Sequence, residues 1–321
     1  TLFPYATLFR STPLRVAATN AAVGTLTGDP TATLALTGTA PRLAVTQDAA
    51  GLFAGVLTGT SGTFVKGGAQ TLTLDNPLSA FSGGTVLDAG TLALKTAALA
   101  GPVAVGGSAT LAAQPPAVSG LMGYYYSVTP NTNNFWTLAR MEAYFATLTP
   151  DLAAPSGLAD LNFDFATNGS RFPQPYGAGG SRTLNFQAVF RGTITVPESG
   201  LYVFGIQADD GFILAIDGQT VLARNRYVAG WTDGSVQLTA GRYDIVLGYF
   251  QLSGGYGLQL RVKLPSQTSA PLVPNAWLTP YTTAGALAGN GGVTVADGAQ
   301  MRVSHTTTTV FAGDLSAAAG S

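Results

Sequence analysis

Two adjacent carboxylates interrupt an otherwise apolar stretch of the chain, Gln207–Gly218 (QADDGFILAIDG). Neighbouring side chains of a regular strand point to opposite faces, so Asp209 and Asp210 can share one ligand only across a distorted or cis peptide. Two close carboxylates also repel each other, and a calcium ion offsets that repulsion because it accepts many oxygen ligands in irregular geometry. Two interpretations stay open: a calcium site, or a turn in which both side chains cap backbone amides before Gly211.

The composition argues against several other kinds of chemistry. The sequence of 321 residues contains no cysteine and has a net charge of −1, which excludes thiolate chemistry and gives no electrostatic basis for nucleic-acid binding. His305 is the only histidine, so a catalytic triad or a zinc site would have to rest on it alone. The two glutamates, Glu142 and Glu198, fall in a helix-like segment and in a turn, which disfavours a glycosidase pair. We therefore expect no enzymatic activity. No run of about 18 apolar residues occurs, so we also expect no transmembrane segment.

The outer parts of the chain repeat one pattern: a short β-rich run, a turn with Gly or Asp-Gly, and a second alternating run. The pattern occurs in Gly84–Leu94, Pro102–Ala113 and Gly292–Val303. Short strands that recur between small turn residues, without helical periodicity, indicate a β-solenoid whose rungs stack their inward side chains. Because the pattern resumes late in the chain, we expect Ala113 and Thr283 to lie close together. Gly292–Val303 should stack on the rung before the insertion.

The central part, from about Ser119 to Tyr281, differs in composition and contains all three tryptophans. Within it, Asn134–Thr147 carries apolar residues at helical spacing. Alternating runs such as Arg242–Phe250 and the hairpin signal Asp217-Gly218 indicate antiparallel strands. We predict an all-β protein in which an antiparallel β-sandwich is inserted between rungs of a right-handed parallel β-helix. The predicted β-helix covers residues 12–114 and resumes at 283–321, and the predicted sandwich covers 115–282.

The first residues, Thr1–Ser11 (TLFPYATLFRS), resemble with one substitution the translation of a sequencing adapter that contaminates assembled metagenomic genes. The alternative is an ordinary strand rich in Thr and Phe. We favour the artefact and leave this range out of the predicted fold. The chain is then expected to be a fragment of a longer protein.

The first flank, Phe53–Leu94, resembles the passenger-associated repeat of bacterial autotransporters. The matching positions are Phe53, Gly55, Leu57, Gly62, Lys66, Gly68, Leu72, Thr73, Leu74, Asn76, Phe81, Ser82, Gly83, Gly84, Thr85, Gly90, Leu92 and Leu94. This resemblance implies a right-handed parallel β-helix on a secreted or surface-displayed bacterial passenger.

The central part resembles the lectin-like domain first named from anthrax protective antigen and shared with glycosidases and yeast flocculins. The resemblance is carried by Leu121–Tyr125, Val196–Leu222, Gly234–Val262 and Pro271–Pro280. It implies a β-sandwich that often binds carbohydrate. In flocculins, the binding depends on calcium held by an Asp-Asp pair that is joined by a cis peptide.

The resemblance therefore favours calcium at Asp209 and Asp210, with sugar hydroxyls filling its open positions. The flocculin-type site takes further ligands, including an Asn, from a second loop. The corresponding loop here, Gln251–Tyr256 (QLSGGY), has neither Asn nor carboxylate, so Gln251, Ser253 and backbone carbonyls would have to substitute in a weaker site. Asn225 is another possible neighbour.

We predict metal ligation by Asp209, Asp210 and Ser253, and glycan contacts by the set Asp209, Asp210, Trp231, Gln251 and Tyr256. An aromatic side chain in a β-sandwich is also compatible with simple core packing. The predicted function is that of a secreted or surface-exposed bacterial adhesin that binds a glycan with the help of calcium. The alternatives are a structural spacer or protein-interaction module and, third, the accessory domain of a secreted glycosidase.

Overall fold

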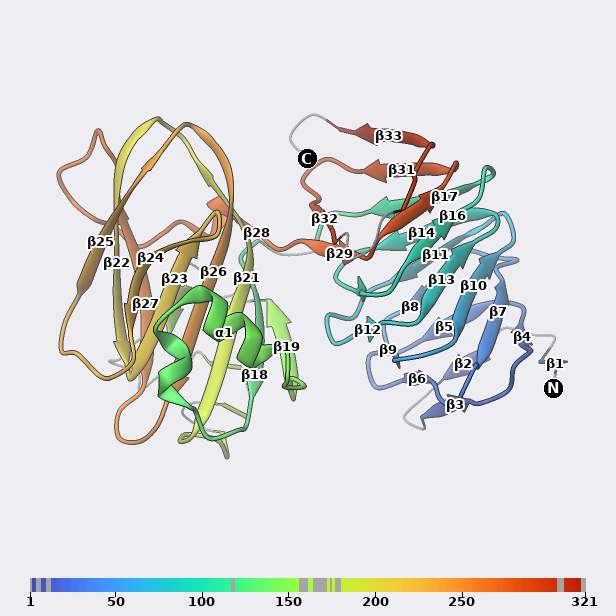
Figure 1. Ribbon diagram of the computed structural model, residues 1–321, viewed down its shortest axis with the longest axis horizontal. Coiled ribbons are helices and arrows are strands. Elements are labelled where there is room, and N and C mark those ends of the chain that lie inside the picture. Colours follow the sequence, from blue (N-terminus) through green and yellow to red (C-terminus); the bar gives the residue numbers. More distant parts are fainter. Residues whose placement is uncertain are drawn as a thin grey trace. The chain divides into compact units, whose positions relative to one another are not determined.

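The structure is a computed structural model that describes residues 2–3, 7–9, 13–116, 119–155, 161–163, 172–173, 175–176, 180–304 and 309–318. Two compact units divide the chain: Thr1–Ala117 with Tyr281–Ser321, and Val118–Pro280 (Figure 1). Both are built almost entirely of strands, as predicted. Among the described residues, no helix is long and apolar enough to cross a membrane. His305 lies outside the described residues.

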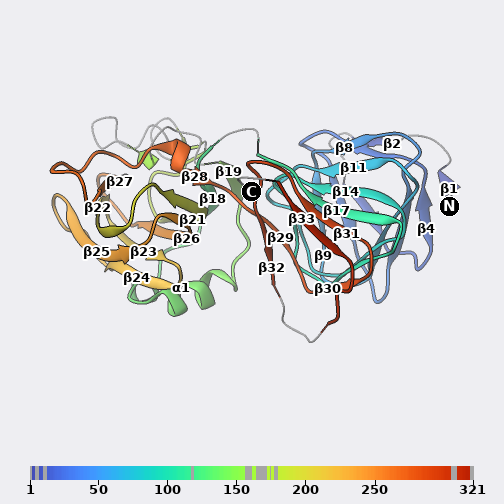
Figure 2. The same ribbon diagram turned by 90° about the horizontal axis from the view of Figure 1, so that it is seen from above.

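Three parallel sheets form the first unit, a β-solenoid (Figure 2). In order, sheet A contains β1 (Leu2–Phe3), β4 (Ala21–Val23), β7 (Arg42–Thr46), β10 (Thr63–Gly67), β13 (Gly84–Leu87), β16 (Val103–Val105) and β30 (Leu287–Gly289). Sheet B contains β2 (Thr7–Phe9), β5 (Leu26–Gly28), β8 (Gly51–Phe53), β11 (Thr71–Leu74), β14 (Gly90–Leu94), β17 (Ala109–Ala113), β31 (Gly292–Val295) and β33 (Asp314–Ala317). Sheet C contains β3 (Leu14–Val16), β6 (Thr33–Leu36), β9 (Val56–Gly59), β12 (Ala80–Phe81), β15 (Ala98–Leu99), β29 (Thr282–Ala284) and β32 (Met301–Val303).

Inward side chains of successive rungs stack in columns, which is why short alternating strands suffice to build this unit. In sheet B, Leu72 pairs with Leu92, Leu92 with Leu111, and Leu111 with Val293. All four side chains are buried. Burying one such aliphatic side chain contributes about 1.5–3 kcal/mol, so the columns supply the stability that each short strand lacks alone.

The solenoid resumes after the insertion, as predicted. The chain leaves the solenoid after β17 and returns at β29, which pairs with β15. The next two strands, β30 and β31, pair with β16 and β17, so Gly292–Val295 stacks on Thr110–Ala113. The following strand, β32, stacks one rung later on β29. The prediction of a sandwich inserted between solenoid rungs is confirmed.

The solenoid begins earlier than residue 12, where we placed its start. Leu2–Phe3 and Thr7–Phe9, inside the range that we left out of the predicted fold, form β1 and β2. These strands pair in parallel with β4 and β5. The backbone of both segments continues the sheets because Thr and Phe have high strand propensity. The interpretation of Thr1–Ser11 as a sequence artefact stays a prediction.

One inward position of the solenoid carries a charge. Lys66 occupies a column of sheet A between Val45 and Leu87, and its side chain is fully buried. Its ammonium donates to the carbonyl oxygens of Gly67 (3.0 Å), Gly68 (2.9 Å) and Ala89 (2.9 Å). Burial lowers the pKa of Lys66. The three carbonyls satisfy all three donors of the ammonium and link two rungs.

Two antiparallel sheets form the second unit, a β-sandwich. Sheet D contains, in order, β19 (Leu152–Pro155), β18 (Met122–Tyr126), β21 (Phe186–Val196), β26 (Gly241–Gln251), β23 (Gly211–Ile216) and β24 (Gln219–Arg224), with β28 (Leu278–Thr279) paired to β21. Sheet E contains β20 (Asn162–Phe163), β27 (Gly257–Lys263), β22 (Gly200–Asp209) and β25 (Thr232–Leu238). A 3₁₀ turn, η4 (Asn275–Trp277), precedes β28.

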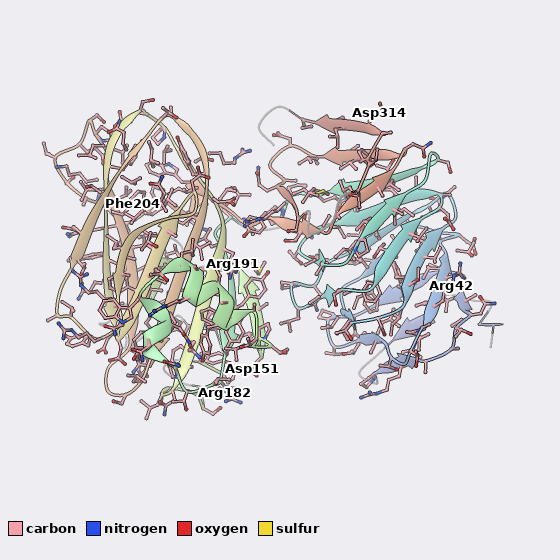
Figure 3. The ribbon with its side chains drawn as sticks, in the orientation of Figure 1. Arg42, Asp151, Arg182, Arg191, Phe204 and Asp314 are labelled. Carbon is pink, nitrogen blue, oxygen red and sulfur yellow. The ribbon has the colours of Figure 1, made fainter. Side chains whose placement is uncertain are left out.

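The core of the sandwich consists of the inward side chains of both sheets, among them Phe204, Leu258 and Tyr249. Phe204 belongs to β22 (Figure 3). The predicted hairpin is confirmed: Asp217 and Gly218 join β23 to β24, and both residues have positive φ angles.

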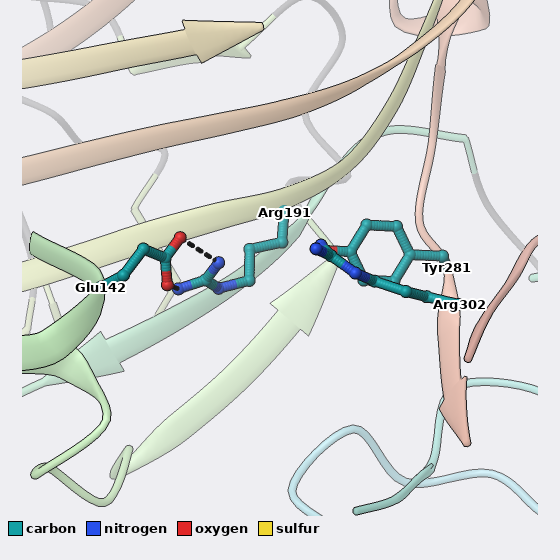
Figure 4. A network of polar contacts seen from close by, with 4 residues as sticks. All are labelled: Glu142, Arg191, Tyr281 and Arg302. Atoms are coloured by element: carbon teal, nitrogen blue, oxygen red, sulfur yellow. Dashed lines mark hydrogen bonds and ion pairs between the residues drawn. The ribbon is translucent and has the colours of Figure 1, made fainter. Parts of the chain in front are cut away.

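The predicted helical segment contains η1 (Thr132–Phe135) and α1 (Leu138–Phe145), and it packs on the outer face of sheet D. Phe135, Met141 and Phe145 are buried there. Arg191 of β21 donates to both carboxylate oxygens of Glu142 at 2.7 and 2.6 Å (Figure 4). Glu142 therefore helps to fix the helix on the sheet.

Candidate functional site

Asp209 and Asp210 lie where the chain crosses from one sheet of the sandwich to the other. Asp209 is the last residue of β22 in sheet E, and Gly211 is the first residue of β23 in sheet D. The peptide bond between the two aspartates is cis, as the flocculin resemblance implies. The pair thus sits at one end of the sandwich.

Backbone donors from the neighbouring loop hold the carboxylate of Asp210. The backbone N–H of Leu252 donates to its Oδ2 at 2.6 Å, and the backbone N–H of Ser253 also donates to this carboxylate. The N–H of Asp210 itself donates to the carbonyl of Phe250 at 3.2 Å. Burial raises the pKa of Asp210, and the two N–H donors partly oppose that rise.

Asp209 is in a less favourable electrostatic position. Burial, together with the negative charge of Asp210, raises the pKa of Asp209 to about 6. No basic residue contributes to the pKa shift of either aspartate, and neither aspartate forms a salt bridge within the described part of the chain. Two partly buried carboxylates without a cationic partner are a suitable environment for a divalent cation.

Tyr249 supports the backbone of the pair from inside the core. Its hydroxyl donates to the carbonyl of Asp209 at 2.6 Å and accepts a hydrogen bond from the N–H of Gly257. The alternating pattern of Arg242–Phe250 places Tyr249 in the core but gives no sign of this contact. The only sequence signal for this contact is that the hydroxyl of a buried tyrosine requires a hydrogen-bond partner.

The side chain of Gln251 holds the loop Gln251–Tyr256 from its buried side. It is fully buried, with its Oε1 3.2 Å from the Tyr249 hydroxyl, and its Nε2 donates to the carbonyl of Gly255 at 2.9 Å. Both polar atoms of the amide are thus engaged inside the protein. In this structure Gln251 positions the loop and does not reach the surface, where we expected it to contact a glycan.

The tip of this loop lies beside the aspartates. Ser253, Gly254 and Gly255 are exposed, and Tyr256 is half-buried against the core. Gly255 approaches so closely that a Cβ atom there would be 3.0 Å from Oδ2 of Asp209. The small residues of the tip therefore leave the carboxylates accessible from outside. Ser253 carries a hydroxyl at this tip, and its backbone N–H donates to the carboxylate of Asp210.

Another loop, residues 225–231, flanks the aspartate pair on the side of sheet D. It follows β24, whose last residue Arg224 pairs with Phe212 just after the aspartates. Asn225 is half-buried at the start of this loop. Among the described residues no cluster of three or more His, Cys, Asp or Glu side chains can hold a metal, so further ligands must be amides, hydroxyls or carbonyls.

Trp231 lies on the outer face of sheet E. Its ring is 4.2 Å from the guanidinium carbon of Arg261, and Arg261 also pairs with Asp233 at 2.9 Å. The structure therefore gives Trp231 an arginine partner, and the predicted contact of Trp231 with a glycan stays a prediction.

The family comparison concerns the second unit. Residues 173–275 match the model of the PA14 domain. This match includes the aspartate pair and both flanking loops, and it agrees with the predicted resemblance to the protective antigen domain. No curated protein matches the chain. The autotransporter resemblance of the solenoid stays a prediction.

Several solved structures match about half of the chain at low identity. An anti-sigma factor domain-containing protein has 20% identity and a TM-score of 0.38, and the match covers 50% of this chain and 47% of that one. The PA14 sugar-binding domain from an RTX adhesin has 19% identity and a TM-score of 0.41, with 51% and 99% covered. The A domain of epithelial adhesin 6 from Candida glabrata, in complex with Galβ1-3GlcNAc, has 16% identity and a TM-score of 0.37, with 53% and 89% covered.

Proposed function

We propose that the sandwich unit binds carbohydrate through a calcium ion held by Asp209 and Asp210. The observation that carries this proposal is the pair itself: two adjacent, partly buried carboxylates without a basic partner, within the region that matches the PA14 domain. Calcium neutralises both charges and offers open coordination positions to vicinal sugar hydroxyls. The protein acts as an adhesin-type module at the surface of a bacterium.

Each residue near the pair has a defined part in this proposal. Asp209 and Asp210 supply the anionic oxygens, and Ser253 with loop carbonyls supplies neutral ones. Tyr256 borders the loop and stacks on the sugar ring. Asn225, at the start of loop 225–231, is a further neutral ligand in this proposal. Tyr249 and Gln251 hold the backbone of the site without touching the ligand.

The solenoid is the carrier in this proposal. Its rungs continue on both sides of the insertion, so the sandwich can be displayed without interrupting the stack. A secreted autotransporter passenger is the parent protein that we propose. In the competing proposal, the sandwich is a spacer that has lost its metal, which the small number of acidic residues near the pair favours.

A glycan array with and without EDTA, combined with a calcium titration by calorimetry on the whole chain, tests the proposal. We expect glycan binding that EDTA removes, and calcium binding in the millimolar range because few anionic ligands are present. Calcium at about a hundred times its dissociation constant should stabilise the fold by about 2.7 kcal/mol. No heat and no shift of the melting temperature at several millimolar calcium would support the spacer.

Calcium affinity should weaken below about pH 6. The ion requires ionised carboxylates, and protonation of Asp209, with its pKa of about 6, competes with binding. We expect about a tenfold loss of affinity between pH 7.5 and pH 5, measured by calorimetry.

The stability of the calcium-free protein should depend on pH in the direction opposite to that of the calcium affinity. A raised carboxyl pKa means that the folded state binds more protons, so its unfolding free energy should fall as the pH rises from about 4 to about 6. For the preceding prediction, a calcium affinity that does not change between pH 7.5 and pH 5 would contradict the role of Asp209 as a calcium ligand.

A further inference from the structure

The outer face of sheet E carries a cross-strand row of polar side chains next to an indole. Asn162 pairs with Gln259, and Gln259 pairs with Gln207. Because Ile206 pairs with Thr232, the preceding residue Trp231 lies beside Gln207. We name Asn162, Gln259, Gln207 and Trp231 the amide row. All four residues are partly exposed.

The amide row points away from the core. The neighbouring residues Ile206, Ala208, Leu258 and Leu260 are buried in the sandwich, and side chains alternate between the two faces of a strand. Adjacent strands are about 4.8 Å apart, so four positions extend over about 14 Å. This is long enough to contact more than one sugar ring. Asp209 stands on the same face of β22, two residues after Gln207.

The amides retain free hydrogen-bonding capacity. The Nε2 of Gln259 donates to the Oδ1 of Asn162 at 2.6 Å, which fixes the two planes relative to each other. Among the residues that the structure describes, the side chain of Gln207 has no hydrogen-bond partner. Gln207 offers both amide donors and its acceptor, and Gln259 keeps one N–H and its carbonyl oxygen, as a row of sugar hydroxyls requires.

The indole is held in place by a neutral pair. Arg261 lies 4.2 Å from the ring of Trp231, and its guanidinium donates to both oxygens of Asp233 at 2.9 and 3.0 Å. Gly205 makes room for this arrangement, because a Cβ atom there would be 2.5 Å from Nε of Arg261 and 2.4 Å from Asp233. The Arg261–Asp233 pair beside the indole is neutral as a whole, which is compatible with a neutral ligand at this part of the row.

We propose that the amide row is a second carbohydrate-binding surface, which takes a neutral glycan chain without calcium. It rests on the proposed carbohydrate binding of this unit and adds a contact surface beyond the aspartate pair. Trp231 stacks on the apolar face of one sugar ring, and the amides of Gln207 and Gln259 bind the hydroxyls of its neighbours.

The test uses neutral oligosaccharides of the cello-, xylo-, manno- and galacto-series. They are titrated into the whole protein in the presence of EDTA, so that the calcium site does not contribute to binding. We expect at least one series to bind, more tightly as oligosaccharide than as monosaccharide. The double variant Gln207→Ala/Gln259→Ala should lose about thirtyfold in affinity, since two neutral hydrogen bonds contribute about 1 kcal/mol each and about 1.4 kcal/mol corresponds to a factor of ten. Gln207→Ala alone should show a smaller loss in the same direction.

Gln237→Ala is the matched control, because Gln237 is an exposed glutamine on β25 of the same sheet, opposite Leu201. It should bind like the wild type. Because EDTA removes calcium from every titration, any binding observed there is separate from the calcium-dependent proposal. Absence of any binding in EDTA, or a double variant that binds as tightly as the wild type, would overturn the amide row as a binding surface.

Discussion

Asp210→Asn is expected to abolish the calcium-dependent part of glycan binding while the sandwich stays folded. The substitution keeps the size of the side chain and an oxygen that can accept the N–H of Leu252. It removes one of the two charges that calcium requires. Mutation of residues that only hydrogen-bond to metal ligands lowers metal affinity by about 10–100-fold. Loss of a charged ligand should therefore lower calcium affinity by at least about a hundredfold.

The stability of the variant gives a second readout. In the calcium-free protein the charge of Asp210 raises the pKa of Asp209, so removing that charge should leave the melting temperature unchanged or higher. The rise of the melting temperature that calcium causes in the wild type should be absent in the variant.

Asp217→Asn is the matched control for this substitution. Asp217 is exposed in the turn between β23 and β24, and its positive φ is one that asparagine tolerates. This variant should bind calcium and glycan as the wild type does. If Asp210→Asn retains the calcium-induced shift, the pair is not the metal site and its carboxylates serve as caps of the loop.

The positions of the strands and of the aspartate pair could be predicted from the sequence because local signals encode them. Asp217-Gly218 specifies a hairpin, and the repeated pattern before Ala113 and after Thr283 specifies a solenoid that resumes. Adjacent aspartates in an apolar stretch likewise indicated an irregular backbone. Each of these signals is contained in a short stretch of sequence, so it can be recognised without knowledge of tertiary packing.

The environment of Gln251 and Trp231 could not be predicted in the same way. Whether Gln251 faces a ligand or the loop depends on Tyr249 and Gly255, which its own position in the sequence does not specify. Trp231 was predicted to contact a glycan because an aromatic side chain can stack on a sugar ring. Its stacking with Arg261 depends on the register of three strands and on the absence of a side chain at Gly205.

A buried lysine gives the largest stability effect that we expect in the solenoid. Lys66→Met should destabilise this unit by about 3 kcal/mol, because it leaves three partly buried carbonyls without the donors of the ammonium, and each such loss costs about 1–3 kcal/mol. Methionine has a similar length and shape, and the column around it already contains Val45 and Leu87. The hydrophobic burial of the methionine therefore offsets part of the lost stability and limits the net destabilisation of the solenoid.

Urea unfolding with two probes measures this effect in the whole protein. All three tryptophans, Trp136, Trp231 and Trp277, lie in the sandwich unit, so their fluorescence reports on that unit alone. Far-UV circular dichroism reports on both units. We expect Lys66→Met to lower the midpoint of the solenoid transition by about 1–3 M urea, since about 3 kcal/mol is divided by a slope of about 1–3 kcal/mol per M. The fluorescence midpoint should not move.

Lys95→Met provides the comparison that shows whether burial is decisive. The ammonium of Lys95 is 3.0 Å from Asp75, and both side chains are partly exposed. Surface ion pairs contribute about 0–1 kcal/mol, so this variant should unfold almost like the wild type. If both lysine variants shift the midpoint equally, the hydrogen bonds of Lys66 do not stabilise the stack. A more stable Lys66→Met would show that a continuous apolar column outweighs the three carbonyl contacts, and that the lysine lowers the stability of the solenoid.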